Sequence, residues 1–340
     1  MTQVEVIYGE RVKPLVPGLL IVGIVALAAR FVSDHYGAPA MLMALLFGIS
    51  LHFLVEQPKS RPGIAFASRT VLRIGVALLG IRISIDMATS LGWGVIALIV
   101  GGVIATILFG MAIARFFGFG PRFAFLSSGA VAICGASAAL AIAATLPKDD
   151  RSEERLVFTV VGVTVLSTIA MIIYPIIADA LDLSPQVAGV FLGATIHDVA
   201  QVVGAGFSVS DESGEVATVV KLLRVAMLAP VIIIATILVR RFADTSEIGG
   251  DRPPLVPFFV VAFFVLVGLN SAGLFPQPVV DVVSELSRWA LLSAIAAVGI
   301  NTSLKDVLDV GGNAIALIVI QTLFIAVFAL SILFWIKPAL

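Results

Sequence analysis

The stretch Leu91–Phe116, LGWGVIALIVGGVIATILFGMAIARF, carries no charged side chain before Arg115. A helix needs about 20 consecutive apolar residues to cross the hydrocarbon core of a bilayer, and this stretch is long enough. Stretches of similar character predict further spans at Pro14–Val32, Ala38–Val55, Ile64–Ser84, Leu156–Leu181, Val216–Val239, Pro254–Leu274, Val279–Ile300 and Ala314–Ile336. The sequence therefore predicts an all-α membrane protein with about 9–11 transmembrane segments.

The composition supports the same class. Of 340 residues, 60% are hydrophobic and 13% are charged, and the mean hydropathy is +1.12. A soluble domain carries about 25% charged residues, so lipid is the expected solvent and partner of this chain. The net charge of −1 gives no reason to expect a nucleic-acid partner, and the single cysteine, Cys134, excludes an intrachain disulfide. Met1–Lys13 lacks a signal-peptide cleavage site, which predicts a retained first span in a bacterial inner membrane.

Two apolar segments, residues 123–146 and 186–209, contain clusters of small and polar residues. The first holds Cys134-Gly135-Ala136-Ser137, and the second holds Gly193-Ala194-Thr195-Ile196-His197-Asp198. Each glycine in a helix interior costs about 1 kcal/mol relative to alanine, so these clusters predict helix breaks. Irregular backbone at membrane depth survives only where protein or a water-filled cavity satisfies it. We therefore expect both segments to belong to the transport core and to form the site.

Two arrangements of these segments remain open: helices that cross the membrane with an interruption, or re-entrant hairpins. Hairpins would place the following basic residues on one side, as the positive-inside rule predicts for the cytoplasm: Arg11, Lys13, Lys59, Arg61, Arg115, Arg122, Lys148, Arg151, Arg155, Arg240, Arg241, Arg252 and Lys305. However, Lys148–Arg155 also contains four acidic residues, which weakens this argument.

An internal repeat is predicted between residues 64–116 and 283–336. When Ser68–Val100 is laid on Ser287–Val319, a Gly-Ile-x-x-Ser motif and the string IALIV match at fixed spacing. The two segments are expected to run in opposite directions. Inverted repeats with substrate held between them are typical of many secondary transporters.

The pair His197-Asp198 is the strongest candidate for ion coupling, because an ionisable group at the bilayer centre costs at least about 2.5–3.5 kcal/mol. Thr195, Gln201 and Lys221 complete this predicted proton or sodium site. The alternative is a buried polar pair that only joins helices. No metal site and no cofactor are expected, since the three histidines lack ligand spacing.

A substrate site for an anion is predicted at Cys134, Gly135, Ala136 and Ser137, where a restarting helix would present free N–H groups. Arg224 is expected to balance the substrate charge, or alternatively to pair with an acid such as Asp198. Close packing of small residues is the alternative for the whole cluster. Further donors are predicted at Arg82, Ser84, Asn301, Thr302 and Ser303.

Three runs together resemble one known family: GVALLGIRIS at 75–84, AICGASAA at 132–139 and GATIHDVAQVVGA at 193–205. They are similar to the YeiH-type sulfate exporters, long catalogued as conserved hypothetical membrane proteins. The resemblance covers nearly the whole chain. It implies a fold like those of sodium–proton antiporters and bile-acid transporters, with inverted repeats, a mobile core and two interrupted helices that cross.

The function expected from these features is secondary active transport of a small anion, ion-coupled, by an elevator-like or rocking motion. The family resemblance implies export, and the residues themselves leave the direction open. Sulfate, another sulfur oxyanion and an organic anion are the candidate substrates. A cation–proton antiporter that uses Asp198 is the main alternative, and a passive channel is a lesser one. An enzyme is not expected, because no nucleophile–base pair or metal motif is present. A homodimer is expected by analogy with similar folds.

Overall fold

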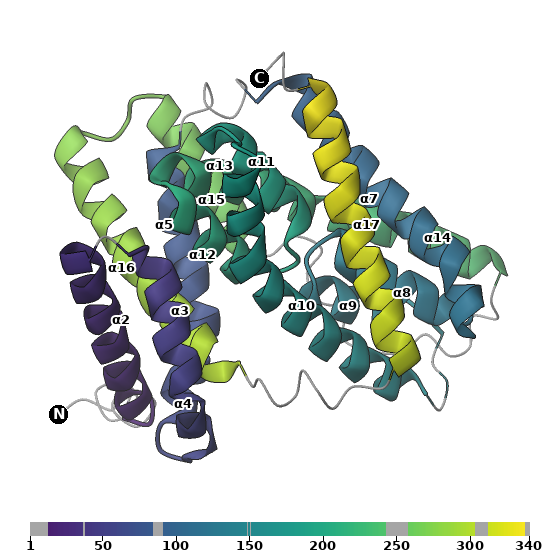
Figure 1. Cartoon of the computed structure of the whole chain (residues 1–340), viewed down its shortest axis with the longest axis horizontal. Coiled ribbons are helices and arrows are strands. Elements are labelled where there is room, and N and C mark those ends of the chain that lie inside the picture. The colour runs from purple at the N-terminus through teal and green to yellow at the C-terminus, as the bar shows by residue number, and fades with distance from the viewer. Residues whose placement is uncertain are drawn as a thin grey trace, which may run out of the picture.

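The computed structural model describes residues 13–36, 38–83, 91–147, 149, 151–242, 258–302 and 312–336, and the regular structure within them is entirely helical. Figure 1 labels the helices, which are α2 (Val16–Tyr36), α3 (Ala40–Ser50), α4 (Arg61–Phe66), α5 (Leu72–Leu79), α7 (Gly92–Ala114), α8 (Pro121–Ala132), α9 (Ala136–Ala143), α10 (Ser152–Ala180), α11 (Pro185–Thr195), α12 (Val199–Val209), α13 (Asp211–Ala226), α14 (Leu228–Phe242), α15 (Phe258–Ser271), α16 (Gln277–Asn301) and α17 (Gly312–Ile336). Short turns η1 (His52–Glu56), η2 (Ala67–Val71), η3 (Gly80–Arg82) and η4 (Arg115–Phe117) extend some of them.

Seven of the described helices are long and apolar enough to cross a membrane. Two of them are composite: α4, η2, α5 and η3 form one rod over Arg61–Arg82, and α13 and α14 form another over Asp211–Ile237. The shorter apolar helices α3 and α15 fall in two further predicted spans. The all-α membrane fold predicted from hydropathy is confirmed.

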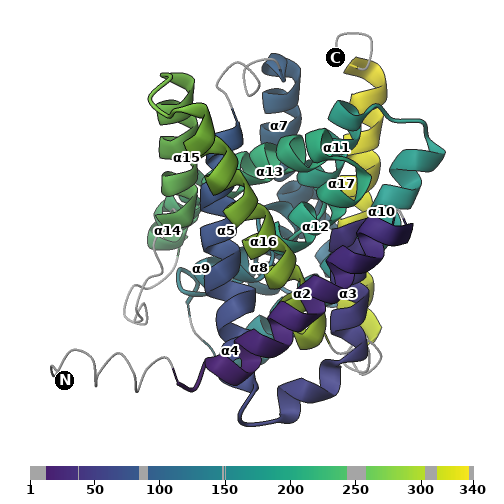
Figure 2. The same cartoon turned by 90° about the vertical axis from the view of Figure 1, so that its left-hand side faces the viewer.

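The helices form two groups. The first helix group contains α2 to α5, α15 and α16, and the second contains α7 to α14 and α17. In Figure 1 the first group lies mainly to the left, and α7, α8 and α17 lie to the right. Figure 2 looks onto the first group, with α2, α3 and α16 towards the viewer. Helix α12 contacts both α3 and α16 and so joins the two groups.

Glycine allows the closest approach inside the first group. A side chain on Gly299 of α16 would collide with the backbone of Leu45 in α3, and one on Gly48 would collide with that of Ala296. Gly299 belongs to the Gly-Ile-x-x-Ser motif that suggested the repeat. The close packing of α16 against α3 therefore explains why glycine occupies this position.

Helices α5 and α16, which start the two halves of the predicted repeat, run antiparallel. The Ser287 hydroxyl donates to the Gly75 carbonyl at 2.7 Å, and the Asn301 amide donates to the Ser68 hydroxyl at 3.0 Å. The opposite directions agree with the expectation from the sequence. That the two halves are repeats stays a prediction.

The α8–α9 segment is a hairpin that starts and ends at the same end of the molecule. Asp149, which follows α9, accepts from Arg122 at the start of α8 at 2.9 Å and from Arg155 at the start of α10 at 2.8 Å. We call this the basic end, because Lys59, Arg61 and Arg115 also lie where described helices begin or end there.

The α11–α12 segment is a second hairpin, and it enters from the opposite end. We call this the acidic end, because Asp179, Asp182 and Asp211 lie where α10 ends and α13 begins. Helix α11 runs parallel to α13, with Gly189 against Ser213 and Gly193 against Ala217. Helix α12 returns antiparallel to α13, which brings Gly206 against Gly214. Each segment therefore returns to the end of the molecule at which it starts, so the structure has hairpins and not the interrupted crossing helices that the family resemblance implied.

Candidate functional site

The tip of the first hairpin is a sharp break between α8 and α9. Ile133 ends α8 with φ −110° and ψ −81°, and Gly135 precedes α9 with φ +62° and ψ −124°. Only glycine adopts the latter conformation without strain. The nearest atoms to a side chain at Gly135 would lie 3.6 Å away, in His197 and Val163, so backbone conformation rather than space requires glycine there.

Replacing Gly135 by alanine is therefore expected to lower the free energy of unfolding by about 1–3 kcal/mol. Thermal or denaturant unfolding of the purified protein would measure this. Gly101→Ala on α7 is the matched control, because no atom lies within 4 Å of its added side chain and its backbone is helical. Equal stability of the two variants would show that the backbone conformation at position 135 does not require glycine.

The tip of the second hairpin consists of Ile196, His197 and Asp198. Ile196 and Asp198 are extended, with φ −66°, ψ 139° and φ −103°, ψ 148°, and Asp198 directly precedes α12. His197 is fully buried and Asp198 is partly buried. The two tips meet around α13, which supplies a lysine and an arginine to them.

Arg224 of α13 binds both tips and is only 1% exposed. Its Nε donates to the Ala132 carbonyl, one terminal nitrogen donates to Gly193 and Ile196, and the other donates to Val131 and Ala132, all at 2.8–3.1 Å. A guanidinium has five N–H groups, and these bonds use all of them.

Lys221 lies one helical turn earlier on α13 and is fully buried. Its ammonium donates to the carbonyls of Ile133 at 2.8 Å and Ile196 at 3.0 Å, and also to that of His197. An ammonium has three donors, so these bonds satisfy it completely.

The two cations compensate the ends of α8 and α11. The last carbonyls of a helix lack partners and carry a partial negative charge equivalent to about half an elementary charge. Six such carbonyl oxygens receive the eight hydrogen bonds of Lys221 and Arg224. Within the described part of the chain no carboxylate forms an ion pair with either residue. Arg224 therefore does not pair with Asp198, and none of its donors is free for a substrate in this conformation. That Arg224 binds the substrate stays a prediction.

The start of α9 faces a cavity of about 540 Å³ between the two helix groups. Ser137 is exposed there, while Cys134 and Gly135 are buried behind it. Thr70 and Arg73 of the first group line the opposite wall, and the remaining lining is apolar. The predicted helix start thus has a donor side chain at an accessible surface, opposite an arginine.

The start of α12 lies in a buried polar cluster. The Asp198 backbone N–H donates to Ser167 of α10 at 3.0 Å, and the Gln201 amide donates to Thr168 at 3.4 Å. The His197 Nε2 lies 2.9 Å from the hydroxyl of Thr322 in α17. The Gln201 Oε1 and the His197 Nδ1 are buried without a partner. An unpartnered buried acceptor costs about 1–3 kcal/mol, which marks this cluster as a candidate site.

Thr195 donates only to the Phe191 carbonyl of its own helix at 2.6 Å, so its hydroxyl serves the end of α11. The described residues contain no group of three or more His, Cys, Asp or Glu side chains that could hold a metal ion.

The other predicted donors lie away from the tips. Arg82 pairs with Glu215 at 2.6 Å and Asp211 at 3.6 Å towards the acidic end. Asn301 and Thr302 end α16 at the basic end, where Asn301 is exposed and bonds Ser68. Ser84 and Ser303 lie outside the described residues. The structure therefore places the predicted ion-coupling residues next to Cys134–Ser137. Arg82, Asn301 and Thr302 lie away from this cluster.

Sequence reasoning missed the residues of α10 and α17 that face the tips. Ser167 and Thr168 are adjacent polar residues in an apolar helix, three and four positions after Thr164, and that spacing was the available signal. Gln321 and Thr322 are adjacent polar residues within the apolar helix α17. Gln321 donates to Ser127 of α8 at 3.2 Å, so adjacent α17 side chains each contact one hairpin.

The chain is similar to a described protein family and to several named membrane proteins. Residues 17–318 match the model of a family described as conserved hypothetical protein 698. The UPF0324 membrane protein RB0971 of Rhizobium meliloti is 60% identical over 93% of this chain and 91% of its own. The UPF0324 membrane protein TauZ of Paracoccus pantotrophus is 58% identical over 92% and 93%. A UPF0324 membrane protein of Chlorobaculum tepidum is 49% identical over 94% and 89%.

Proposed function

Because this chain belongs to the conserved hypothetical protein 698 family, whose named relatives are membrane proteins, we propose that it is a secondary active transporter of a small anion. The family resemblance inferred from the three sequence motifs is confirmed. The chain is a multi-pass membrane protein. We place it in the bacterial inner membrane with the basic end in the cytoplasm, following the positive-inside rule.

The charge balance at the hairpin tips carries this proposal. The two helix ends and two helix starts that meet there contribute about −0.5 and +0.5 each and cancel. Lys221 and Arg224 then contribute +2, and ionised Asp198 contributes −1. The site thus has an excess of about +1 in a low-dielectric environment, which favours an anion. Sulfate, another sulfur oxyanion and an organic anion all fit this charge.

The cavity beside Ser137 supplies the access route in this proposal. It lies between the two helix groups, so an anion there would contact α9 on one side and Arg73 on the other. Arginine provides a planar set of donors suited to oxyanions. Cys134, Gly135 and Ala136 would contribute backbone rather than side chains, since Cys134 is buried.

An elevator-like motion would have to separate ion pairs at the acidic end. Arg82 and Arg288 belong to the first helix group, whereas Asp211 and Glu215 belong to the second. These bonds hold the two helix groups together at the acidic end. We therefore assign this conformation to a state that is closed at the acidic end, and a homodimer remains part of the proposal by analogy.

The test is thermal stabilisation of the purified protein by sulfate, thiosulfate, sulfonates, dicarboxylates and sodium at several pH values. A ligand at 100 times its Kd stabilises the folded state by about 2.7 kcal/mol. We expect one anion class to stabilise the wild type and to lose at least tenfold in affinity in Ser137→Ala. Ser331→Ala, an exposed serine of α17 that bonds only its own helix, is the control. Absence of stabilisation by every anion would overturn the proposal.

A cation–proton antiporter is the second candidate, and the unpartnered Gln201 Oε1 near Asp198 favours it. Oxygen ligands of this kind suit sodium. Stabilisation by sodium alone, lost in Asp198→Asn and independent of every anion, would support that function instead.

A further inference from the structure

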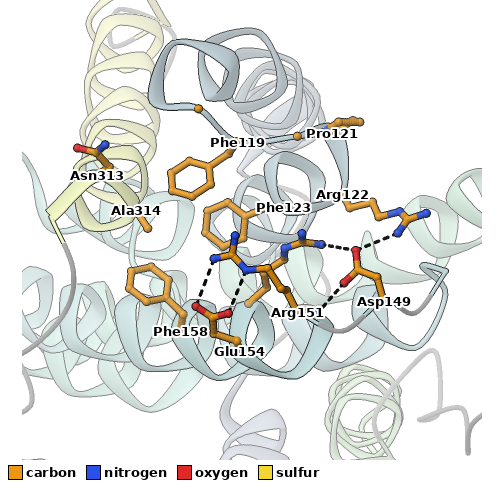
Figure 3. Close-up of a pocket in the computed structure, with 13 residues that line it drawn as sticks. Phe119, Pro121, Arg122, Phe123, Asp149, Arg151, Glu154, Phe158, Asn313 and Ala314 are labelled. Carbon is orange, nitrogen blue, oxygen red and sulfur yellow. Dashed lines mark hydrogen bonds and ion pairs between the residues drawn. The ribbon is translucent and has the colours of Figure 1, made fainter.

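A second cavity, also of about 540 Å³, lies at the basic end (Figure 3). It is formed by the turn between α7 and α8, the start of α10 and the start of α17. It is separate from the hairpin tips, and the proposed transport function does not use it. Three arginines and three phenylalanines line it together with Asp149 and Glu154.

The described side chains leave this cavity with an excess of positive charge. Arg122 and Arg155 share Asp149, and Arg151 pairs with Glu154 at 3.1 Å. Hydrogen bonds from Arg155, and also from Ser152, Arg151 and Arg122, lower the pKa of Asp149 to about 2, so this carboxylate is already ionised at neutral pH. Three guanidinium groups therefore face two carboxylates, with an excess of about +1.

The arginines also keep donors for a ligand. Arg122 and Arg155 each bond Asp149 through one terminal nitrogen, and Arg151 bonds Glu154 through Nε and one terminal nitrogen. Since each guanidinium has five N–H groups, each retains several. The Arg151 side chain is 64% exposed, and Figure 3 shows it paired with Glu154.

The remaining wall is aromatic. Phe119 and Phe123 have ring centroids 4.6 Å apart, and Phe158 lies 6.1 Å from Phe123. The neighbouring Phe116 is 76% exposed, with the Arg115 guanidinium 4.9 Å from its ring centroid. Because α8, α10 and α17 all begin here, this wall lies at the level where spans enter the membrane. The cavity thus combines arginine donors with an apolar wall at the lipid headgroup level.

We propose that this cavity binds the headgroup of an anionic phospholipid, with its phosphate on Arg122 and Arg151 and its glycerol and first acyl carbons against the phenylalanines. A free phosphate would share the arginine contacts, and the aromatic wall and the position at the membrane entry favour the lipid. Basic pockets between membrane helices are known to take such headgroups. A bound lipid would tie the base of the first hairpin to α10 and α17.

The test compares three probes on the delipidated, detergent-purified full chain: phosphatidylglycerol, phosphatidylcholine and inorganic phosphate. Native mass spectrometry would count bound lipids, and thermal unfolding would report stabilisation. We expect phosphatidylglycerol to bind at least tenfold more tightly than phosphatidylcholine. Arg151→Gln should weaken that binding about fivefold, and Arg151→Lys should retain most of it.

Arg30→Gln is the matched control, because Arg30 forms a similar exposed pair with Asp34 within one helix at the other end. Arg151 pairs only within its own helical turn, so its loss is expected to leave the fold intact. Equal binding of the two phospholipids, or equal losses in Arg151→Gln and Arg30→Gln, would overturn the proposal. Stabilisation by inorganic phosphate as large as that by phosphatidylglycerol would also overturn it in favour of a soluble anion.

Discussion

Replacing Arg224 by methionine is expected to lower the free energy of unfolding by about 3–5 kcal/mol, the range for removing one partner of a buried charged interaction. The substitution keeps an unbranched apolar chain but removes five hydrogen bonds to the carbonyls of α8 and α11. Those carbonyls belong to buried residues, so bulk water does not reach them to replace the guanidinium. Denaturant unfolding in detergent would measure the loss.

Two variants make this expectation specific. Arg224→Lys should be intermediate, because an ammonium has three donors instead of five. Arg288→Met is the control, since Arg288 is partly exposed and holds only carboxylates near the surface. If Arg224→Met kept wild-type stability and lost only the effect of the anion, Arg224 would be a substrate ligand and not a tie between the hairpins.

Asp198→Asn is expected to separate anion binding from ion coupling. The substitution removes one negative charge at the tips and so raises the local excess from about +1 to about +2. Protonation of Asp198 in the wild type has the same effect, and binding linkage is reciprocal, so anion binding should strengthen in acid. The variant should bind the anion equally well at all pH values, with an affinity that the wild type reaches only in acid. Its proton-driven transport should fall at least 100-fold.

Liposome uptake with an imposed pH gradient would measure transport, and thermal stabilisation would measure binding. Gln201→Leu provides the comparison, because it removes an amide from the same cluster without changing its charge. An Asn variant with intact proton-driven transport would exclude Asp198 as the coupling group. Loss of anion binding at every pH would instead indicate that the Asp198 carboxylate organises the start of α12.

The helices and the breaks could be predicted from local patterns. Apolar length marked the spans, and glycine next to small polar residues marked the tips at Gly135 and Ile196–Asp198. The choice between hairpins and crossing helices could not be made, because the loop 148–155 mixes basic and acidic residues. The hairpin arrangement is shown by the hydrogen bonds of Asp149 to both Arg122 and Arg155. Arg122 lies 27 positions before Asp149 in the sequence. Charge counting along a loop does not contain that information.

The hydrogen-bond partners of Lys221 and Arg224 could not be predicted from the sequence either. Lys221 and Arg224 were recognisable as unusual in an apolar helix. A carboxylate or an anion was the expected partner of Arg224, and Lys221 was assigned to the ion-coupling site. Backbone carbonyls have no sequence signature, so helix ends cannot be identified as partners before the chain is folded. The partner of Arg82 could not be predicted for a related reason: Glu215 lies in a different helix group, and no local pattern connects the two residues.

The contacts of Arg224 also constrain the order in which the chain is assembled. The carbonyls of Val131 and Ala132 are synthesised 93 and 92 residues before the guanidinium that binds them. At a synthesis rate of about 5–20 residues per second, the first hairpin waits about 5–20 s for its partner. During that interval its exposed helix end needs other donors, from water, lipid headgroups or the insertion machinery. Assembly of the two hairpin tips is therefore completed only when α13, which follows both hairpins in the chain, has been made.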